Sequence, residues 1–394
     1  MPTQPPVAQD LELSVVMPCL NEARTVGACV QEARDAMARA GIAGEVLIAD
    51  NGSTDGSQTI AEAQGARVVP VAEKGYGHAL RGGIMAARGR FILMGDADQS
   101  YDFAHLPRFV EKLRAGCDLV MGNRFLGGVQ PGAMPWKNRY LGNPVLTFVG
   151  KLFFHTDIGD FHCGLRGFSA EAYRRMNLRT TGMEFASEMV IKSVILGLNV
   201  TEVPTVLRPD GRDRAPHLRP WRDGWRHLRF MLLFSPRWLF FYPGILLMLG
   251  GALLGGAILP GPLHLGRVQL DVHTLLFAAG GIMIGFQAVS FAALSKFFAI
   301  RSGLRPHEAS FETWLGKFTL EKGIIAGGVL ILAGISLWGG ALWYWGEHGF
   351  GLLQPTQTLR WVIPGTLCLA LGCQMILTSF FLGVLRLDTR GNNP

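Results

Sequence analysis

"RFILMGDADQSYDF", residues 90–103, joins a short apolar run to a cluster of acids. The run RFIL is typical of a buried strand, and Asp96, Asp98 and Asp102 follow it. Acids in such a place either cap the next helix or hold a cation. Asp102 directly precedes a segment with helical periodicity, so it is a suitable N-cap. Asp96 and Asp98 are then left without a structural task.

The spacing of Asp96 and Asp98 favours a shared ligand. Residues i and i+2 of an ideal strand face the same side, so both carboxylates can converge on one group. Two adjacent negative charges repel each other unless a cation neutralises them. Hard divalent cations such as Mg²⁺ or Mn²⁺ take oxygen ligands and commonly bridge a carboxylate to a substrate phosphate. We therefore expect a divalent metal as the cofactor of this site.

Strands and helices alternate along the first half of the chain. The apolar pattern predicts strands at 11–18, 44–57 (ending in a turn), 67–71, 90–98, 117–124 and 199–209, with helices between them. Residues 125–160 are rich in Gly and Pro and are expected to be irregular. This order predicts an α/β, doubly wound, mostly parallel sheet, which binds ligands at the carboxyl ends of its strands.

A second acidic motif, "LIADNGSTDGS" (47–57), ends the strand that begins at Gly44. Asp50 at a strand end of a doubly wound sheet lies where a nucleotide binds. The same Asp, Asn and Ser residues are also typical of an Asx turn that leads into a helix. For the motif taken alone the turn is the more common explanation, and both explanations stay open.

The remainder of the chain is apolar. Hydrophobic residues make up 49% of the sequence, and four apolar stretches at about 238–259, 272–299, 323–345 and 361–385 approach or exceed the span of a bilayer. None of these stretches has an acid near its centre, which argues against an ion-coupled transporter. We expect an all-α transmembrane domain of four helices at 238–394. These spans anchor the protein in the lipid bilayer and can also assist formation of a homo-oligomer.

Basic residues predict the orientation in the membrane. The net charge is +7, and the segment 216–237 combines recurring arginines with interleaved tryptophans. Such a segment suits a membrane surface better than nucleic acid, which is not expected as a partner. The loop between the second and third spans is the most basic one. The positive-inside rule then places the domain at 1–215 and the C-terminus in the cytoplasm, in a multi-pass inner (cytoplasmic) membrane protein.

Five motifs in order carry a family resemblance: "VVMPCLNEA", "VLIADNGSTDGS", "KGYGHALRGGI", "MGDADQSYDF" and "GNRF". Over residues 11–235 the chain resembles the family-2 inverting glycosyltransferases of the GT-A fold. It is most similar to their polyprenyl-phosphate branch, the dolichyl-phosphate mannose or glucose synthases. The resemblance implies transfer of one hexose from a nucleotide sugar to polyprenyl phosphate at the cytoplasmic face, with inversion at the anomeric carbon. UDP-glucose is the favoured donor and GDP-mannose the second.

The resemblance also implies roles for single residues. Those matched to nucleotide-sugar binding are Pro18, Glu22, Asp50, Lys74, Asp96 and Glu184, and those matched to the metal are Asp96, Asp98 and Gln99. In the mannose synthases the corresponding glutamine lies one residue after the position of Gln99, where this chain has Ser100. Residues matched to the lipid phosphate are Arg124, Arg139 and Arg166, and the catalytic candidates are Asp98, Asp160, Arg124 and Arg139.

Simpler explanations stand beside several of these roles. Lys74 is equally well a solvated loop residue. Arg124 and Arg139 can form ion pairs with nearby acids. Glu184 and Glu188 lie four residues apart on one predicted helix face, where one of them orients the sugar or both form a surface pair.

The acceptor type decides whether a base is needed. A sugar hydroxyl needs a general base, whereas a phosphate monoester is already anionic near neutral pH. The enzyme must then mainly position two anions and offset their repulsion, which explains arginines and a metal.

Two rival functions remain. "QTLRW" (357–361) fits the QxxRW pattern of processive polysaccharide synthases, although we interpret Trp361 as an interfacial anchor. A membrane protein that binds nucleotide sugar without turnover is the second alternative.

Overall fold

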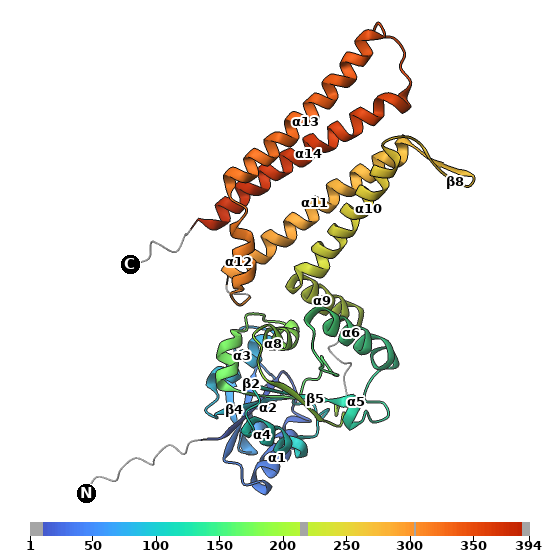
Figure 1. Cartoon of the computed structure of the whole chain (residues 1–394). Coiled ribbons are helices and arrows are strands. Elements are labelled where there is room, and N and C mark those ends of the chain that lie inside the picture. Colours follow the sequence, from blue (N-terminus) through green and yellow to red (C-terminus); the bar gives the residue numbers. More distant parts are fainter. Residues whose placement is uncertain (1–10, 213–219, 303–304, 388–394) are drawn as a thin grey trace. The chain divides into compact units, whose positions relative to one another are not determined.

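In the computed structural model, which describes residues 11–212, 220–302 and 305–387, the chain forms two units, Met1–Phe234 and Ser235–Pro394. The first unit is built on a seven-stranded sheet in the order β3-β2-β1-β4-β6-β5-β7 (Figure 1). Its strands are β1 (Leu13–Cys19), β2 (Gly44–Asp50), β3 (Arg67–Pro70), β4 (Phe91–Met94), β5 (Leu119–Asn123), β6 (Arg166–Ser169) and β7 (Val200–Pro204). The pairs β1–β2, β1–β4, β2–β3 and β5–β7 are parallel, so the predicted mostly parallel sheet is confirmed.

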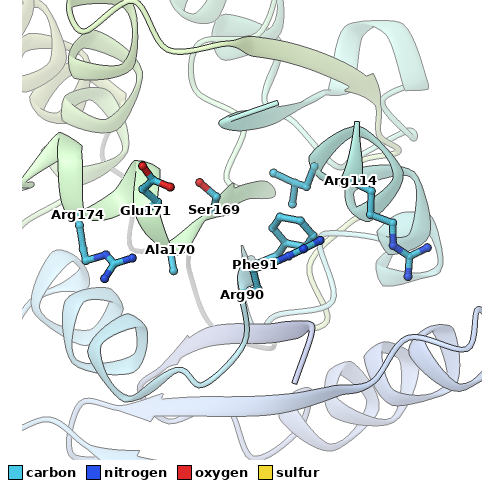
Figure 2. A pocket seen from close by; sticks show the side chains of 8 residues that line it. Arg90, Phe91, Arg114, Ser169, Ala170, Glu171 and Arg174 are labelled. Atoms are coloured by element: carbon cyan, nitrogen blue, oxygen red, sulfur yellow. The ribbon is translucent and has the colours of Figure 1, made fainter. Parts of the chain in front are cut away.

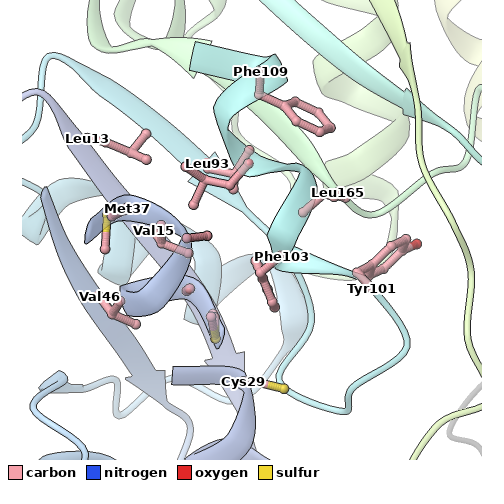
Figure 3. Packing of buried hydrophobic residues seen from close by; sticks show 14 of the residues in the cluster. Leu13, Val15, Cys29, Met37, Val46, Leu93, Tyr101, Phe103, Phe109 and Leu165 are labelled. Carbon is pink, nitrogen blue, oxygen red and sulfur yellow. The ribbon is translucent and has the colours of Figure 1, made fainter. Parts of the chain in front are cut away.

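Helices cover both faces of this sheet. They are α1 (Val26–Arg39), α2 (Ser57–Ala63), α3 (Tyr76–Ala86), α4 (Leu106–Arg114), α5 (Arg124–Gly127), α6 (Asn143–Phe154), α7 (Ala170–Met176), α8 (Glu184–Ile195) and α9 (Pro220–Phe234), with short turns η1 (Phe103–His105) and η2 (Asn138–Gly142). Side chains alternate along β1, so Val15 and Met17 enter a core with α1 and α4 (Figure 3), whereas Val16 enters a core with α3 and α8.

Two parts of the first unit differ from the sequence prediction. Strand β6 was missed, and it pairs antiparallel with both β4 and β5. It has only four residues, too few for an alternating pattern to be recognised. The segment 125–160 is also less irregular than expected, because it contains η2 and the twelve-residue helix α6. Pro144 lies in the first turn of α6, where proline is well tolerated.

The second unit contains helices η3 (Arg237–Phe241), α10 (Tyr242–Ile258), α11 (Val272–Arg301), α12 (Ala309–Gly316), α13 (Leu320–Glu347) and α14 (Pro355–Arg386), and a small hairpin of β8 (Leu263–Leu265) and β9 (Val268–Leu270). Among the described residues, four helices are long and apolar enough to cross a membrane: Arg237–Ile258, α11, α13 and α14. The predicted transmembrane domain of four helices is thus confirmed in number, and each predicted stretch overlaps one of these helices. The basic segment expected at 216–237 is divided: α9 belongs to the first unit, residues 216–219 lie outside the described residues, and Arg237 begins the second unit.

Small residues let the membrane helices approach closely. A Cβ on Gly334 of α13 would lie 2.7 Å from the carbonyl oxygen of Gly365 in α14, and one on Gly372 of α14 would lie 2.6 Å from that of Gly327. Such contacts replace the hydrophobic effect as the source of helix association in lipid. The Gly-rich composition of the spans therefore has a direct structural explanation.

Candidate active site

The carboxyl ends of β1 and β4 form the topological switch point of the sheet. β1 lies between β2 and β4, so the chain leaves it toward both sides, which is where doubly wound sheets bind ligands. Pairing with β4 stops at Val16 and Met94, whereas pairing with β2 continues to Cys19 and Asp50. The two pairings therefore diverge beyond Val16, and we call the region beside the end of β1, where a doubly wound sheet is expected to bind its ligand, the crevice. Pro18 lies there, beyond the last pair with β4.

The two acids of the DAD motif enter this crevice from a turn. β4 ends at Met94, so Asp96 and Asp98 lie beyond the strand. The prediction that they face the same side because they alternate along a strand was therefore wrong. Gln99 adopts a positive φ of 64°, and Asp98 accepts hydrogen bonds from the backbone and hydroxyl of Ser100 at 3.0 and 2.5 Å. Asp96 accepts from the hydroxyl of Tyr76 at 3.1 Å. The turn, rather than the strand, brings the two acids close to each other.

Asp102 caps a helical turn, as predicted. Its carboxylate accepts the N–H of Ala104 at 2.9 Å and so caps the helical turn η1. It also pairs with Arg208 at 2.5 Å. The division of the motif into one cap and two remaining acids is therefore confirmed.

Arg212 is a site residue that the sequence analysis missed. Its Nε donates to the carboxylate of Glu22 at 2.9 Å, and its Nη1 atom lies 3.2 Å from the carboxylate of Asp98. The backbone of Gly211 donates to the carbonyl of Asp98 at 2.9 Å, which holds the segment after β7 against the DAD turn. Arg212 lies between the last predicted strand (199–209) and the basic segment assigned to the membrane surface (216–237), so no motif in the sequence marked it.

Three carboxylates, those of Glu22, Asp96 and Asp98, lie near the guanidinium of Arg212 in the crevice. Glu22 and Asp98 are nearly inaccessible to solvent. Burial and the charge of Asp98 raise the pKa of Asp96 to about 7, although Tyr76 and Arg212 act in the opposite direction. In the described part of the chain, no three His, Cys, Asp or Glu side chains converge closely enough to hold a metal. The arrangement suits a cation that shares its ligands with a bound substrate.

The side chain of Gln99 packs against the segment after β7. A Cβ on Gly211, in this segment, would lie 2.4 Å from the Gln99 Oε1 atom. The metal role predicted for Gln99 has no support from this position.

Asp50, at the end of β2, holds its own turn. Its buried carboxylate accepts the N–H groups of Gly52 and Ser53 at 3.0 and 3.1 Å and the amide of Gln58 at 2.6 Å. Burial opposes the charged form, but the hydrogen bonds from Ser53 and Gln58 prevail and lower the pKa of Asp50. Asp50 therefore forms the Asx-type turn that the sequence left open, and this turn lies at the strand end where a nucleotide is expected. The exposed Lys74 is fixed at this end too, by a 2.5 Å hydrogen bond to the carbonyl of Asn51.

The predicted acceptor residues Arg124 and Asp160 form a buried ion pair. The guanidinium of Arg124 donates twice to the carboxylate of Asp160, each time at 2.7 Å, and the Arg124 backbone donates as well at 3.0 Å. Burial opposes the charge of Arg124, but Asp160 outweighs it and raises the pKa of the guanidinium. Glu202 of β7 accepts the N–H groups of Gly159 and Asp160 at 2.9 and 3.0 Å. Such a bidentate pair, itself held by a third group, orients the guanidinium rigidly.

Tyr101 joins this pair to the acids. Its buried side chain lies close enough to both Asp96 and Arg124 for each charge to act on its hydroxyl, which accepts the N–H of Gly164 at 2.7 Å. The acids of the DAD motif and Arg124 therefore lie at the same edge of the sheet.

The other candidates are placed differently. Arg166 is fully buried, and its guanidinium donates to the backbone carbonyls of Cys163, Phe161 and Ala186, so it holds the loop before β6 rather than facing solvent. Glu188 is buried, pairs with Lys192 at 2.8 Å and accepts the N–H groups of residues 179 and 180.

Two candidates remain accessible. Arg139 lies on η2, half-exposed, with its guanidinium over the ring of Tyr140. Glu184 begins α8 and is also half-exposed. Both keep polar atoms available for a ligand.

The cavity shown in Figure 2 lies elsewhere. Its volume is about 450 Å³, and Arg90, Phe91, Arg114 and Arg174 contribute to its lining. Arg90 and Phe91 mark the amino end of β4, whereas the acids lie beyond its carboxyl end. This cavity is therefore not part of the candidate active site.

The QTLRW motif has a structural task in the second unit. Arg360 donates to the carbonyls of Ile258 and Leu259 at the end of α10 and pairs with Asp271, which precedes α11. Trp361 is 53% exposed, as expected for an interfacial anchor. Because Arg360 ties α14 to the α10–α11 connection, the motif is explained without a polymer-binding role.

Comparisons with known proteins agree with this arrangement. Two family descriptions match the chain: Glycosyl transferase family 2 over residues 14–176, and Glycosyltransferase family 2 C-terminal transmembrane region over residues 293–386. The chain is similar to the low-salt glycan biosynthesis hexosyltransferase Agl6 of Haloferax volcanii, with 37% identity over 95% of this chain and 89% of that protein. It is 30% identical to a dolichyl-phosphate hexose transferase of the same organism, over 50% of this chain and 83% of the relative.

A solved structure also resembles part of the chain. Glucosyl-3-phosphoglycerate synthase of Mycobacterium tuberculosis matches 57% of this chain and 80% of its own, with 20% identity and a TM-score of 0.46. Values this low carry no argument about ligands or activity.

Proposed function

The chain belongs to glycosyltransferase family 2 and is a membrane-bound hexosyltransferase of that type, and we propose that it moves one hexose from a nucleotide sugar to polyprenyl phosphate. UDP-glucose is the favoured donor and GDP-mannose the second. The observation that carries this proposal is that a group of neighbouring carboxylates and a rigidly held arginine lie at the same edge of the sheet.

On the donor side, the proposed task is to bind a nucleoside diphosphate sugar in the crevice beside β1. Glu22, Asp50 and Asp96 would contact the nucleoside, and Lys74 the diphosphate. Asp96 and Asp98 fit a divalent metal such as Mg²⁺ or Mn²⁺, because their two negative charges repel each other and their oxygens suit a hard cation. When bound, such a metal offsets the charge of the departing diphosphate.

On the acceptor side, Arg124 and Arg139 would contact the lipid phosphate. A phosphate monoester with a second pKa of about 6 is already an anionic nucleophile near neutral pH. Its oxygen can attack the anomeric carbon opposite the diphosphate, which inverts that carbon, and no proton need be removed. The fixed pairing of Asp160 with Arg124 supports a positioning role for Asp160 rather than a role as base.

We also propose that the reaction occurs at the cytoplasmic face of the inner membrane. The basic residues at the facing ends of α11 and α13 and between them support this orientation; they are Lys296, Arg301, Arg305, Lys317 and Lys322.

A reconstitution assay tests the function. The purified full-length protein is incubated with polyprenyl phosphate, Mg²⁺ or Mn²⁺ and a panel of UDP- and GDP-sugars, and the product mass is measured. One hexose on polyprenyl phosphate is the expected product. A polysaccharide, or nucleotide-sugar binding without any transfer, would refute the proposal.

A further inference from the structure

The second unit contains a cluster of basic residues at one end of the antiparallel α10–α11 hairpin. Arg237 begins the first span, Lys296 lies near the end of α11, and Arg305 follows in the connection to α12. The start of α10 and the end of α11 lie at the same end of this hairpin, next to α12 (Figure 1). We call Arg237, Lys296 and Arg305 the basic cluster.

One acid serves this cluster. The Nζ atom of Lys296 lies 2.6 Å from the carboxylate of Glu308 and 4.3 Å from the ring centre of Phe311. A terminal nitrogen of Arg305 lies 3.8 Å from the same carboxylate. The Nε atom of Arg305 is buried and has no hydrogen-bond partner among the described residues. A buried N–H without a partner is costly, so this atom marks a place where an acceptor is missing.

The charges do not balance. Burial opposes the charged form of Glu308, but Lys296, Arg305 and Arg237 together lower its pKa. Burial lowers the pKa of Arg305, and Arg237 adds to this effect although Glu308 opposes it. Among the described residues, Glu308 is the carboxylate that acts on all three cations, so the cluster has more positive than negative charge there.

Neighbouring cations are satisfied in a different way. Arg301 donates to the carbonyl of Leu387 at 3.0 Å, and Arg386 donates to that of Leu315 at 2.6 Å. These two arginines bind the ends of helices, which explains their positions. Within the described part of the chain, no hydrogen bond or ion pair holds Arg237, which is exposed at the start of its helix.

We propose that the basic cluster binds the phosphate group of an anionic lipid at the membrane surface. Guanidinium groups match phosphate geometry with two parallel hydrogen bonds, and the free Nε of Arg305 is a donor of that kind. Basic pockets between membrane helices are typical sites for anionic lipid head groups. The site lies wholly in the second unit, and it does not depend on the proposed transferase reaction.

Lipid binding is measured on the purified full-length protein in neutral detergent by native mass spectrometry and thermal unfolding. The probes are phosphatidylglycerol, phosphatidylcholine, polyprenyl phosphate and inorganic phosphate. We expect phosphatidylglycerol to bind and raise the melting temperature, and phosphatidylcholine and inorganic phosphate to leave it unchanged; polyprenyl phosphate serves as the reference for binding at the proposed acceptor site. An equal effect of inorganic phosphate would refute the lipid assignment, and no effect of phosphatidylglycerol would refute the site.

Variants locate the binding. Arg237→Gln and Arg305→Gln are each expected to lower the affinity for the anionic lipid about tenfold, because each removes one charge-assisted contact. Lys317→Gln removes an exposed cation from the same connection and should change nothing. Equal losses in all three variants would contradict a defined site.

Glu308→Gln gives a test that does not depend on losing a cation. Because Glu308 competes with the lipid for the cations, its neutralisation is expected to tighten binding several-fold. Unchanged or weaker lipid binding in a folded Glu308→Gln protein would overturn the proposal.

Discussion

Arg212→Gln is expected to change the pH dependence of donor binding. In the wild-type protein Asp96 has a pKa of about 7, so kcat/KM for the nucleotide sugar should fall as the pH drops through 7. The reason is that protonated Asp96 has lost the charge that attracts a cation. Removing Arg212 removes a positive charge that stabilises ionised Asp96, so this acidic limb should move to higher pH.

The size of the effect follows from the charges in the crevice. The ordinary pKa of an aspartate is 3.8, so the shift of Asp96 to about 7 is worth about 4 kcal/mol between its two protonation states. One opposite charge beside a carboxylate lowers its pKa by roughly 1–3 units. Arg212 also divides its attraction between Glu22 and Asp98, so we expect the limb to move up by about 1 unit.

The assay measures kcat/KM for the nucleotide sugar between about pH 5.5 and about pH 9. The concentration of Mg²⁺ or Mn²⁺ is low and is the same at every pH. Arg208→Gln is the matched control, because it removes an arginine from the same segment that pairs with Asp102 and Glu32 instead. An unchanged limb in Arg212→Gln, or a limb that moves down, would refute the reasoning. The same upward shift in both variants would show that net charge, rather than the contact with the crevice, sets the pKa.

The remaining predictions separate donor, acceptor and structural roles. Asp98→Asn should lower kcat/KM for the donor by about 100-fold or more, whereas Asp160→Asn should cost less and act mainly on KM for polyprenyl phosphate, as steady-state kinetics with each substrate varied will show. Chelation of divalent ions should abolish transfer, and added Mg²⁺ or Mn²⁺ should restore it; full activity in a chelator would exclude the metal. Glu188→Ala should destabilise the first unit by about 3–5 kcal/mol, because it leaves Lys192 as an unpaired buried charge, and thermal unfolding measures this. Glu184→Ala, four residues away, should unfold like the wild type and raise KM for the donor if Glu184 contacts the sugar.

Much of the first unit could be predicted from local patterns. The apolar runs that became β1, β2 and β5 are continuous because these strands are buried on both faces of the sheet. The predicted acids Asp50, Asp96 and Asp98 lie at the carboxyl edge because parallel strands end at the same edge. β6 could not be predicted, because its place between β4 and β5 depends on pairing with two strands far away in the sequence.

Site residues were found where their motif is local and missed where it is not. Asp102 was assigned correctly because a cap acts within three residues of itself. Arg212 was missed because its contacts with Glu22 and Asp98 cross most of the first unit. Arg166 was assigned to the lipid phosphate by its place in a motif, but burial gives its guanidinium to backbone carbonyls instead.

The sequence by itself determined the α/β sheet, the four membrane helices, the family and the acids at the strand ends. These depend on periodicity, length and residue type, which act over a few neighbouring positions. Only the tertiary structure decided which charges meet: Arg212 with the DAD turn, Asp160 with Arg124, and three cations around Glu308. The physical reason is that an ion pair depends on distance in space, and the fold brings together residues between which the sequence shows no connection.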